Sequence, residues 1–192
     1  MVKNEPNHLK AYSNGKIIFL NLEKNIYLIS KNDTENLTAK KNQEEYVAKL
    51  RDNLRWPENL KPSIKIIYHY IYSFLLSRRH RCDTIKEQLC ILTLHSNTNK
   101  KESSNKEIEE YSTLYQYLRN ILPKRPLCLE DSVCCFLFLS RYINGLEFVI
   151  GVKFPPFAAH AWVESHNIIL NDTKLAVEDY SVILRYKNEG NL

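Results

Sequence analysis

The sequence predicts an α+β fold, in which a small N-terminal β-meander precedes a larger region of helices followed by a second group of strands. Two observations support this prediction. Residues 15–30 and several short segments after residue 146 are rich in β-branched and aromatic side chains. The residues between these groups instead repeat their apolar side chains at helical spacing. Strands and helices that occur in separate blocks are typical of α+β proteins.

The length and composition suit two parts in a globular protein. A chain of 192 residues can hold a small module and a second domain of about 100 residues or more. We expect a module at residues 1–57 and a domain at residues 58–192. No apolar run reaches the roughly 18 residues of a membrane span, and the first ten residues are polar rather than signal-like. We therefore expect a cytoplasmic protein with no membrane span.

Cysteine usage and charge argue against several other classes. The five cysteines are odd in number and irregularly spaced, which disfavours a disulfide framework, and none has the spacing of zinc ligands. We expect no metal and no cofactor. The net charge of +5 is modest and its basic residues are spread along the chain, so the sequence does not indicate a nucleic-acid partner.

The first thirty residues predict a three-stranded meander. Apolar, β-branched segments alternate there with polar residues suited to tight turns, including Ser-Asn-Gly at residues 13–15. The strands are expected at residues 8–12, 15–22 and 25–30.

Helical periodicity follows in five segments. Pro57 ends the first of them, Ser63 and Asp83 are suitable N-caps for the next two, and Gly145 is a plausible C-cap for the last. The last helix is strongly apolar, so we expect it to be central and buried. The helices are expected at residues 44–56, 64–79, 84–95, 108–122 and 128–142.

The final segments predict a second sheet. Three consecutive strands are expected, with a turn at His166–Asn167, and a later β-branched segment adds a fourth. They lie at residues 147–154, 159–165, 167–172 and 181–186.

A cysteine, a histidine and an aspartate occur in the last third in the order that a cysteine nucleophile requires. Cys128 begins the predicted helix, where free backbone N–H groups and the helix dipole favour a thiolate and can stabilise an oxyanion. His160 lies on a predicted strand and can pair with that thiolate as an imidazolium. Asp172, at the end of the next strand, can accept from the far ring nitrogen and orient it.

Each of these residues also has a more ordinary interpretation. A lone cysteine is more often a small core residue, and a histidine near Trp162 is more often a packed, hydrogen-bonded core residue. Asn171-Asp172 at a strand end is more often a turn. The residues alone therefore leave a catalytic triad and a structural explanation open.

Neighbouring residues receive structural interpretations. Phe157 and Trp162 can wall a substrate cleft, although aromatic core positions are more frequent. The acids Glu130–Asp131 suit the positive end of a helix dipole, which is reason enough for them. The Cys134–Cys135 pair lies within the apolar helix, so we expect core packing.

The motifs of this region closely resemble those of the B proteins of lasso-peptide biosynthesis, in particular the fused, microcin-type maturation proteins. The similarity covers about 45 residues. The matching motifs are Cys128-Leu129, Val149-Ile150-Gly151-Val152, Pro156-Phe157, His160-Ala161-Trp162-Val163-Glu164 and Asn171-Asp172.

The resemblance implies a transglutaminase-like core related to papain-type folds. It implies a cysteine peptidase that removes the leader from a ribosomally made precursor peptide, with Cys128 as nucleophile, His160 as base and Asp172 as orienting acid. It also implies that an ATP-dependent lasso cyclase is a partner, so that any ATP dependence is indirect.

The resemblance further implies that the N-terminal meander is a winged-helix-like peptide-recognition module. Such a module binds the leader as an added strand on a sheet edge. The receiving edge would be Ile26, Tyr27, Leu28 and Ile29.

Two other functions remain open. The same triad can serve an acyltransferase, in which an amine rather than water accepts the acyl group. The chain can also be a leader-binding scaffold without activity, for which leader binding survives the loss of Cys128 and no cleavage occurs under any condition.

Overall fold

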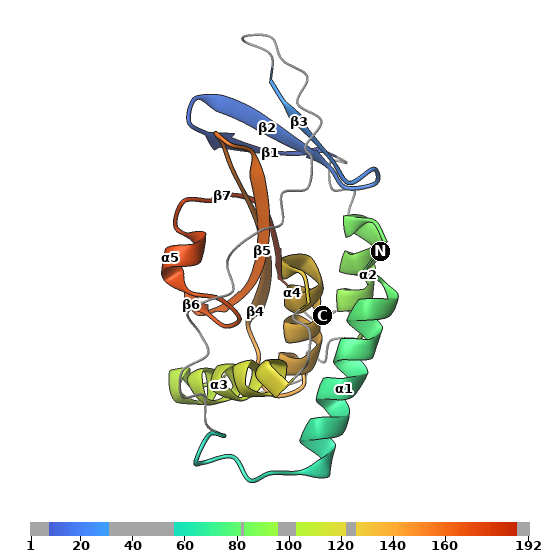
Figure 1. Ribbon diagram of the computed structural model, residues 1–192, viewed down its shortest axis with the longest axis vertical. Coiled ribbons are helices and arrows are strands. Elements are labelled where there is room, and N and C mark those ends of the chain that lie inside the picture. Colours follow the sequence, from blue (N-terminus) through green and yellow to red (C-terminus); the bar gives the residue numbers. More distant parts are fainter. Residues whose placement is uncertain (1–7, 31–55, 82, 96–102, 122–125, 188–192) are drawn as a thin grey trace.

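The computed structural model describes residues 8–30, 56–81, 83–95, 103–121 and 126–187, and it is a mixed α+β structure with two antiparallel sheets (Figure 1). The elements are β1 (His8–Ser13), β2 (Lys16–Asn21), β3 (Ile26–Ile29), α1 (Ile64–Arg79), α2 (Ile85–His95), α3 (Asn105–Ile121), α4 (Cys128–Leu139), β4 (Leu146–Lys153), β5 (Ala158–Ser165), β6 (Ile168–Ile169), α5 (Lys174–Val177) and β7 (Ser181–Lys187).

The N-terminal sheet has the order β1-β2-β3, so the predicted meander is confirmed. Asn14 and Gly15 join β1 to β2 with positive φ angles of 45° and 77°. Two residues with positive φ make the turn that matches the twist of a β-hairpin, and glycine adopts this conformation readily. Ile18 and Leu20 of β2 are fully buried beneath the sheet.

The C-terminal sheet has the order β6-β5-β4-β7 and contains all the predicted C-terminal strands. The turn between β5 and β6 is at His166–Asn167, as predicted, and both residues have positive φ. The expected strand at residues 167–172 is too long, however, because β6 ends at Ile169 and is followed by a backbone bond from the Leu170 N–H to the Val163 carbonyl at 2.9 Å. The side-chain Oδ1 of Asn171 accepts from the Val163 N–H at 2.9 Å, so a side chain takes the place of a backbone acceptor there.

Helix α4 occupies the centre of the molecule and packs against α1, α2, α3, β4 and β5 (Figure 1). All ten residues from Glu130 to Leu139 are buried. Full burial of each large side chain, such as Phe136 or Phe138, contributes about 1.5–3 kcal/mol to folding. The predicted start is confirmed. The helix ends at Leu139 rather than residue 142, and Gly145 instead makes a positive-φ turn into β4.

The other described helices begin at side-chain caps. Ser63 caps α1 as predicted, accepting from the Lys65 N–H. Capping boxes at residues 84–87 and 104–107 start α2 and α3. The predicted cap Asp83 is therefore wrong, and its carboxylate instead pairs with a neighbouring histidine. The second box also explains why α3 begins three residues before the predicted start.

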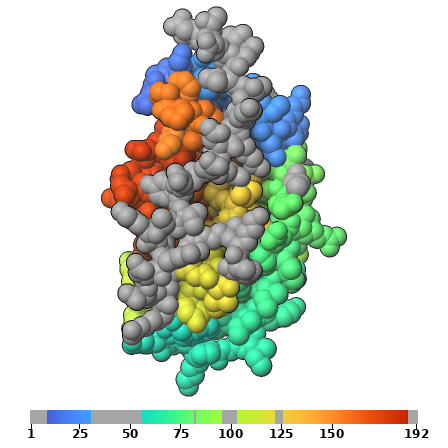
Figure 2. All heavy atoms as spheres, in the orientation of Figure 1, coloured from blue at the N-terminus to red at the C-terminus, as the bar shows by residue number. Residues whose placement is uncertain are grey.

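The N-terminal sheet is attached directly to the C-terminal sheet, with β1 packed against β7 and β4. The Phe154 N–H donates to Ser13 Oγ at 3.0 Å, and Asn14 Nδ2 donates to the Phe154 carbonyl at 2.6 Å. At the other end, the Ile85 N–H donates to Asn25 Oδ1 at 2.7 Å. Figure 2 shows the blue N-terminal strands beside the orange end of β5.

Two further expectations, a helix before Pro57 and the absence of a membrane span, can be compared with the structure only where it describes the chain. The helix predicted at residues 44–56 lies outside them, apart from Trp56 at its end. Within the described ranges, no helix is long and apolar enough to cross a membrane.

Candidate active site

Cys128 is the first residue of α4, and its placement there follows from the local sequence. Leu127 precedes the helix in an extended conformation, and its carbonyl accepts from the Asp131 N–H at 2.7 Å. The apolar residues that follow draw the helix into the core. The half-buried thiol of Cys128 is therefore held at the positive end of a central helix.

His160 and Asp172 lie close together next to this helix start. His160 is on β5, paired with Gly151 of β4, and Asp172 lies in the bend after β6. His160 Nε2 is 2.6 Å from Asp172 Oδ2. The other carboxylate oxygen accepts from the Thr173 N–H at 2.8 Å, which fixes the carboxylate plane. The structure thus brings all three predicted triad residues together.

The electrostatics of the site favour an ion pair between the thiol and the imidazole. Burial opposes ionisation of Cys128, but the hydrogen bond and charge of His160, with N–H groups of Ala161 and Leu129, lower the pKa of the thiol. Burial alone would lower the pKa of His160, but its bonds to Asp172 and Cys128 raise it to about 9. Because Nε2 is engaged by Asp172, Nδ1 is the ring nitrogen left for the sulfur.

Aromatic side chains hold the His160 ring from the side. The Trp162 ring stacks near it, with ring centroids 6.0 Å apart, and the Tyr180 ring lies at 5.5 Å. Trp162 is only 2% exposed and donates from Nε1 to Glu164 at 2.5 Å. Of the two interpretations of Trp162, a wall of a substrate cleft or the more frequent core position, its burial favours the core position, from which the ring packs beside the histidine.

Trp162 and Tyr180 pack against the backbone of Gly151, which has no side chain to keep them away. A Cβ at this position would lie 2.7 Å from the Trp162 ring and 2.8 Å from Tyr180 Cβ. We expect Gly151→Ala to lower the free energy of unfolding by about 1–3 kcal/mol, because it overpacks the site. Denaturant unfolding measures this loss. Adding Trp162→Phe removes the clashing ring atoms and should restore part of it, whereas an unaffected single variant would contradict this reading of the packing.

The predicted peptide-binding strand β3 presents two kinds of side chain. Ile26 and Leu28 are 45% and 53% exposed, whereas Tyr27 and Ile29 are half-buried. The Tyr27 ring lies 5.2 Å from the Phe157 ring. Burial, together with the charge of nearby Cys128, raises the pKa of Tyr27 to about 12. One residue of the N-terminal sheet therefore lies close to the candidate nucleophile.

The acids after Cys128 have partners that our dipole interpretation missed. Asp131 is 6% exposed and its Oδ2 is 2.8 Å from Arg119 Nη1 on α3. Glu130 is also buried, 3.4 Å from Arg78. The signal for this was present in the sequence, since acids on a helix that is apolar on every side are buried and need a partner.

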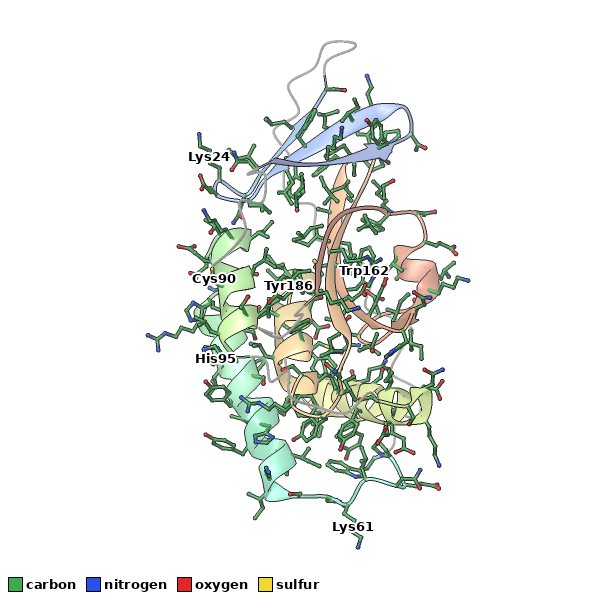
Figure 3. All side chains as sticks on the ribbon, turned by 180° about the vertical axis from the view of Figure 1, so that it is seen from behind. Lys24, Lys61, Cys90, His95, Trp162 and Tyr186 are labelled. Atoms are coloured by element: carbon green, nitrogen blue, oxygen red, sulfur yellow. The ribbon has the colours of Figure 1, made fainter. Side chains whose placement is uncertain are left out.

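The remaining described cysteines are separated from the site. Cys134 and Cys135 are buried in α4, as predicted, and burial raises the pKa of both thiols. Cys90 is exposed on α2, on the other side of α4 from Trp162 (Figure 3). Among the described residues, no three metal-binding side chains gather into a cluster.

Sequence comparison gives an independent view of this region. Residues 73–185 match the transglutaminase-like superfamily, and this segment runs from within α1 to β7 and contains all three triad residues. No curated protein and no solved structure matches the chain significantly. The matched segment covers more than half of the 192 residues. The chain therefore belongs to the transglutaminase-like superfamily, which includes cysteine peptidases and acyltransferases.

Proposed function

We propose that this protein is a cysteine peptidase that removes the leader from a ribosomally made lasso-peptide precursor. The observation that supports this most directly is the linked arrangement of Cys128, His160 and Asp172 at a helix N-terminus. The motif resemblance to lasso-peptide B proteins gives the substrate class.

The chemistry requires no group beyond these residues and water. The Cys128 thiolate attacks the scissile carbonyl carbon, forming a C–S bond and an oxyanion. The His160 imidazolium then donates its proton to the leaving amine as the C–N bond breaks. In the second half, water loses a proton to His160 and attacks the acyl carbon. The C–S bond breaks, the leader leaves as a carboxylic acid, and the thiolate returns.

The edge of the N-terminal sheet suits a peptide substrate. Within the described residues, β3 pairs only with β2, so its outer edge is available for an added strand. Ile26 and Leu28 offer apolar contacts on the exposed face of β3. Tyr27, on the inward face, lies beside Phe157 and near Cys128. A leader bound at this edge would thus be held close to the nucleophile.

The product defines the partner. Cleavage frees the amine of the core peptide, and that amine is the group an ATP-dependent lasso cyclase would acylate. We therefore include this cyclase as a protein partner, with ATP used by the cyclase alone.

A second candidate function is acyl transfer by the same triad, which membership of the superfamily favours equally. The two functions share the acyl-enzyme and differ only in the acceptor. Water gives a shortened peptide with a new carboxylate, whereas an amine gives a new amide.

Mass spectrometry of a precursor peptide tests the proposal. We expect wild type, with the cyclase present, to give a leader-length cut that is absent for Cys128→Ala. Cys90→Ala is the matched control and should cleave normally, because Cys90 is exposed on α2. An amide adduct in place of the cut would support acyl transfer. An intact precursor that still binds to wild type would support the inactive scaffold.

A further inference from the structure

A buried asparagine lies where the elements that carry the triad meet. Asn171 is 4% exposed and precedes Asp172 directly. Its Nδ2 donates to Asp131 Oδ2 and to Ser132 Oγ of α4, each at 3.0 Å. Its Oδ1 accepts from the Val163 N–H of β5 at 2.9 Å. The amide side chain therefore uses both of its N–H groups to bond to α4, which carries Cys128, and its oxygen to bond to β5, which carries His160.

Two of these bonds lead to a triad residue by a short route. Ser132 Oγ donates to the Cys128 carbonyl at 2.8 Å. Val163 lies three residues after His160 on the same strand. A shift of Asn171 would therefore move Asp172 relative to both the histidine and the cysteine.

The Arg119–Asp131 ion pair holds Asn171 from the other side. Arg119 Nη1 donates to Asp131 Oδ2 at 2.8 Å and to the Asn171 carbonyl at 2.7 Å. The Tyr115 hydroxyl donates to the other Asp131 oxygen at 2.8 Å. Three side chains therefore donate to the Asp131 carboxylate, two from α3 and Asn171 from the bend after β6, and Asp131 is a rigid acceptor for the asparagine. Directional hydrogen bonds in a dry interior set positions more tightly than apolar packing does.

We infer that Asn171, braced by Arg119 and Asp131, is a positioning residue that sets the distances within the Cys128–His160–Asp172 triad. It touches no reacting atom and acts through its neighbours. The inference rests on the proposed role of Cys128 as the nucleophile. Because reacting groups misplaced by about 1 Å can lose about 10²-fold in rate, a modest shift at Asn171 is enough to matter.

The test compares serine and asparagine variants by the reactivity of Cys128. Ser132→Ala removes the hydrogen bond to the Cys128 carbonyl. Asn171→Ala removes the side-chain hydrogen bonds of the asparagine to Asp131, Ser132 and Val163. Ser140→Ala is the matched control, since this buried serine at the end of α4 also donates to a helix carbonyl, that of Leu137 at 3.0 Å. Iodoacetamide labelling is measured from pH 5 to 10 on the Cys128 peptide by mass spectrometry, which keeps the exposed Cys90 from contributing.

We expect Asn171→Ala to raise the pH midpoint of labelling by about one unit, which lowers the thiolate fraction, and hence slows labelling, by about tenfold at pH values below the wild-type midpoint. Ser132→Ala should slow it about threefold, and Ser140→Ala should stay within about twofold of wild type at a comparable loss of stability. Ser132→Ala keeps the test decisive if Asn171→Ala does not fold.

The outcomes separate this inference from the proposed function. If wild type shows a low labelling midpoint and neither Ser132→Ala nor Asn171→Ala changes it, the cluster is merely structural and the inference is overturned. If wild type labels like an ordinary thiol and His160→Ala makes no difference, the nucleophile itself is refuted, and the inference falls with it.

Discussion

His160→Ala is expected to remove the low-pH reactivity of Cys128 and to slow peptide cleavage by about 10²–10⁴-fold, the usual contribution of a general acid–base residue. The imidazole supplies the hydrogen bond and the positive charge that lower the pKa of the thiol. Without the imidazole, no positive charge offsets the effect of burial, which favours the neutral thiol. The pKa of Cys128 should therefore rise above its ordinary value.

The pH profile of wild type follows from the direction of the two pKa shifts. Thiolate forms as pH rises through the lowered pKa of Cys128, so labelling should increase there and then reach a plateau. Cleavage also needs the imidazolium to protonate the leaving amine. His160 loses that proton as pH rises through about 9, so cleavage should fall again on the alkaline side while labelling does not.

Labelling rates at pH 6 and the full pH profile of cleavage check this prediction. His95→Ala is a suitable control, because His95 is a half-buried residue at the end of α2 and contacts Tyr72 rather than the triad. A His160→Ala protein that labels as fast as wild type at pH 6 would refute the ion pair.

The second large effect is expected from Arg119→Ala, which should lower the free energy of unfolding by about 3–5 kcal/mol. Arg119 is 7% exposed and is the cationic partner of buried Asp131. Its removal leaves a carboxylate in the core to which, among the side chains that the structure describes, Tyr115 and Asn171 donate. A buried charge without its counter-ion is costly because the interior solvates it poorly.

Denaturant unfolding of the variant, with Arg185→Ala as control, tests this expectation. Arg185 is also paired with carboxylates, those of Glu164 and Glu147, but its side chain is 42% exposed. Exposed ion pairs contribute about 0–1 kcal/mol. An equal decrease in the free energy of unfolding in the two variants would show that the buried Arg119–Asp131 pair contributes no more to stability than an exposed pair does.

Much of the fold could be predicted because it depends on local patterns. The Asn14-Gly15 hairpin turn and the apolar periodicity of residues 128–139 indicated their structures without any long-range information. The errors lie at element ends. Thr84 rather than Asp83 caps α2, a choice that depends on which side chain reaches the free N–H groups. The strand after β5 ends early because Asn171 bonds sideways into the core.

The sequence by itself determined which residues are candidates for the chemistry, because a cysteine at a helix start, a strand histidine and a following aspartate are recognisable from residue type and order. Only the tertiary structure decided what holds them. The partners of Asn171 come from α3, α4 and β5, and the ring beside Phe157 comes from β3, far away in the chain. Such contacts leave no local pattern, because they depend on how separate elements pack, and packing brings together residues that the chain order keeps apart.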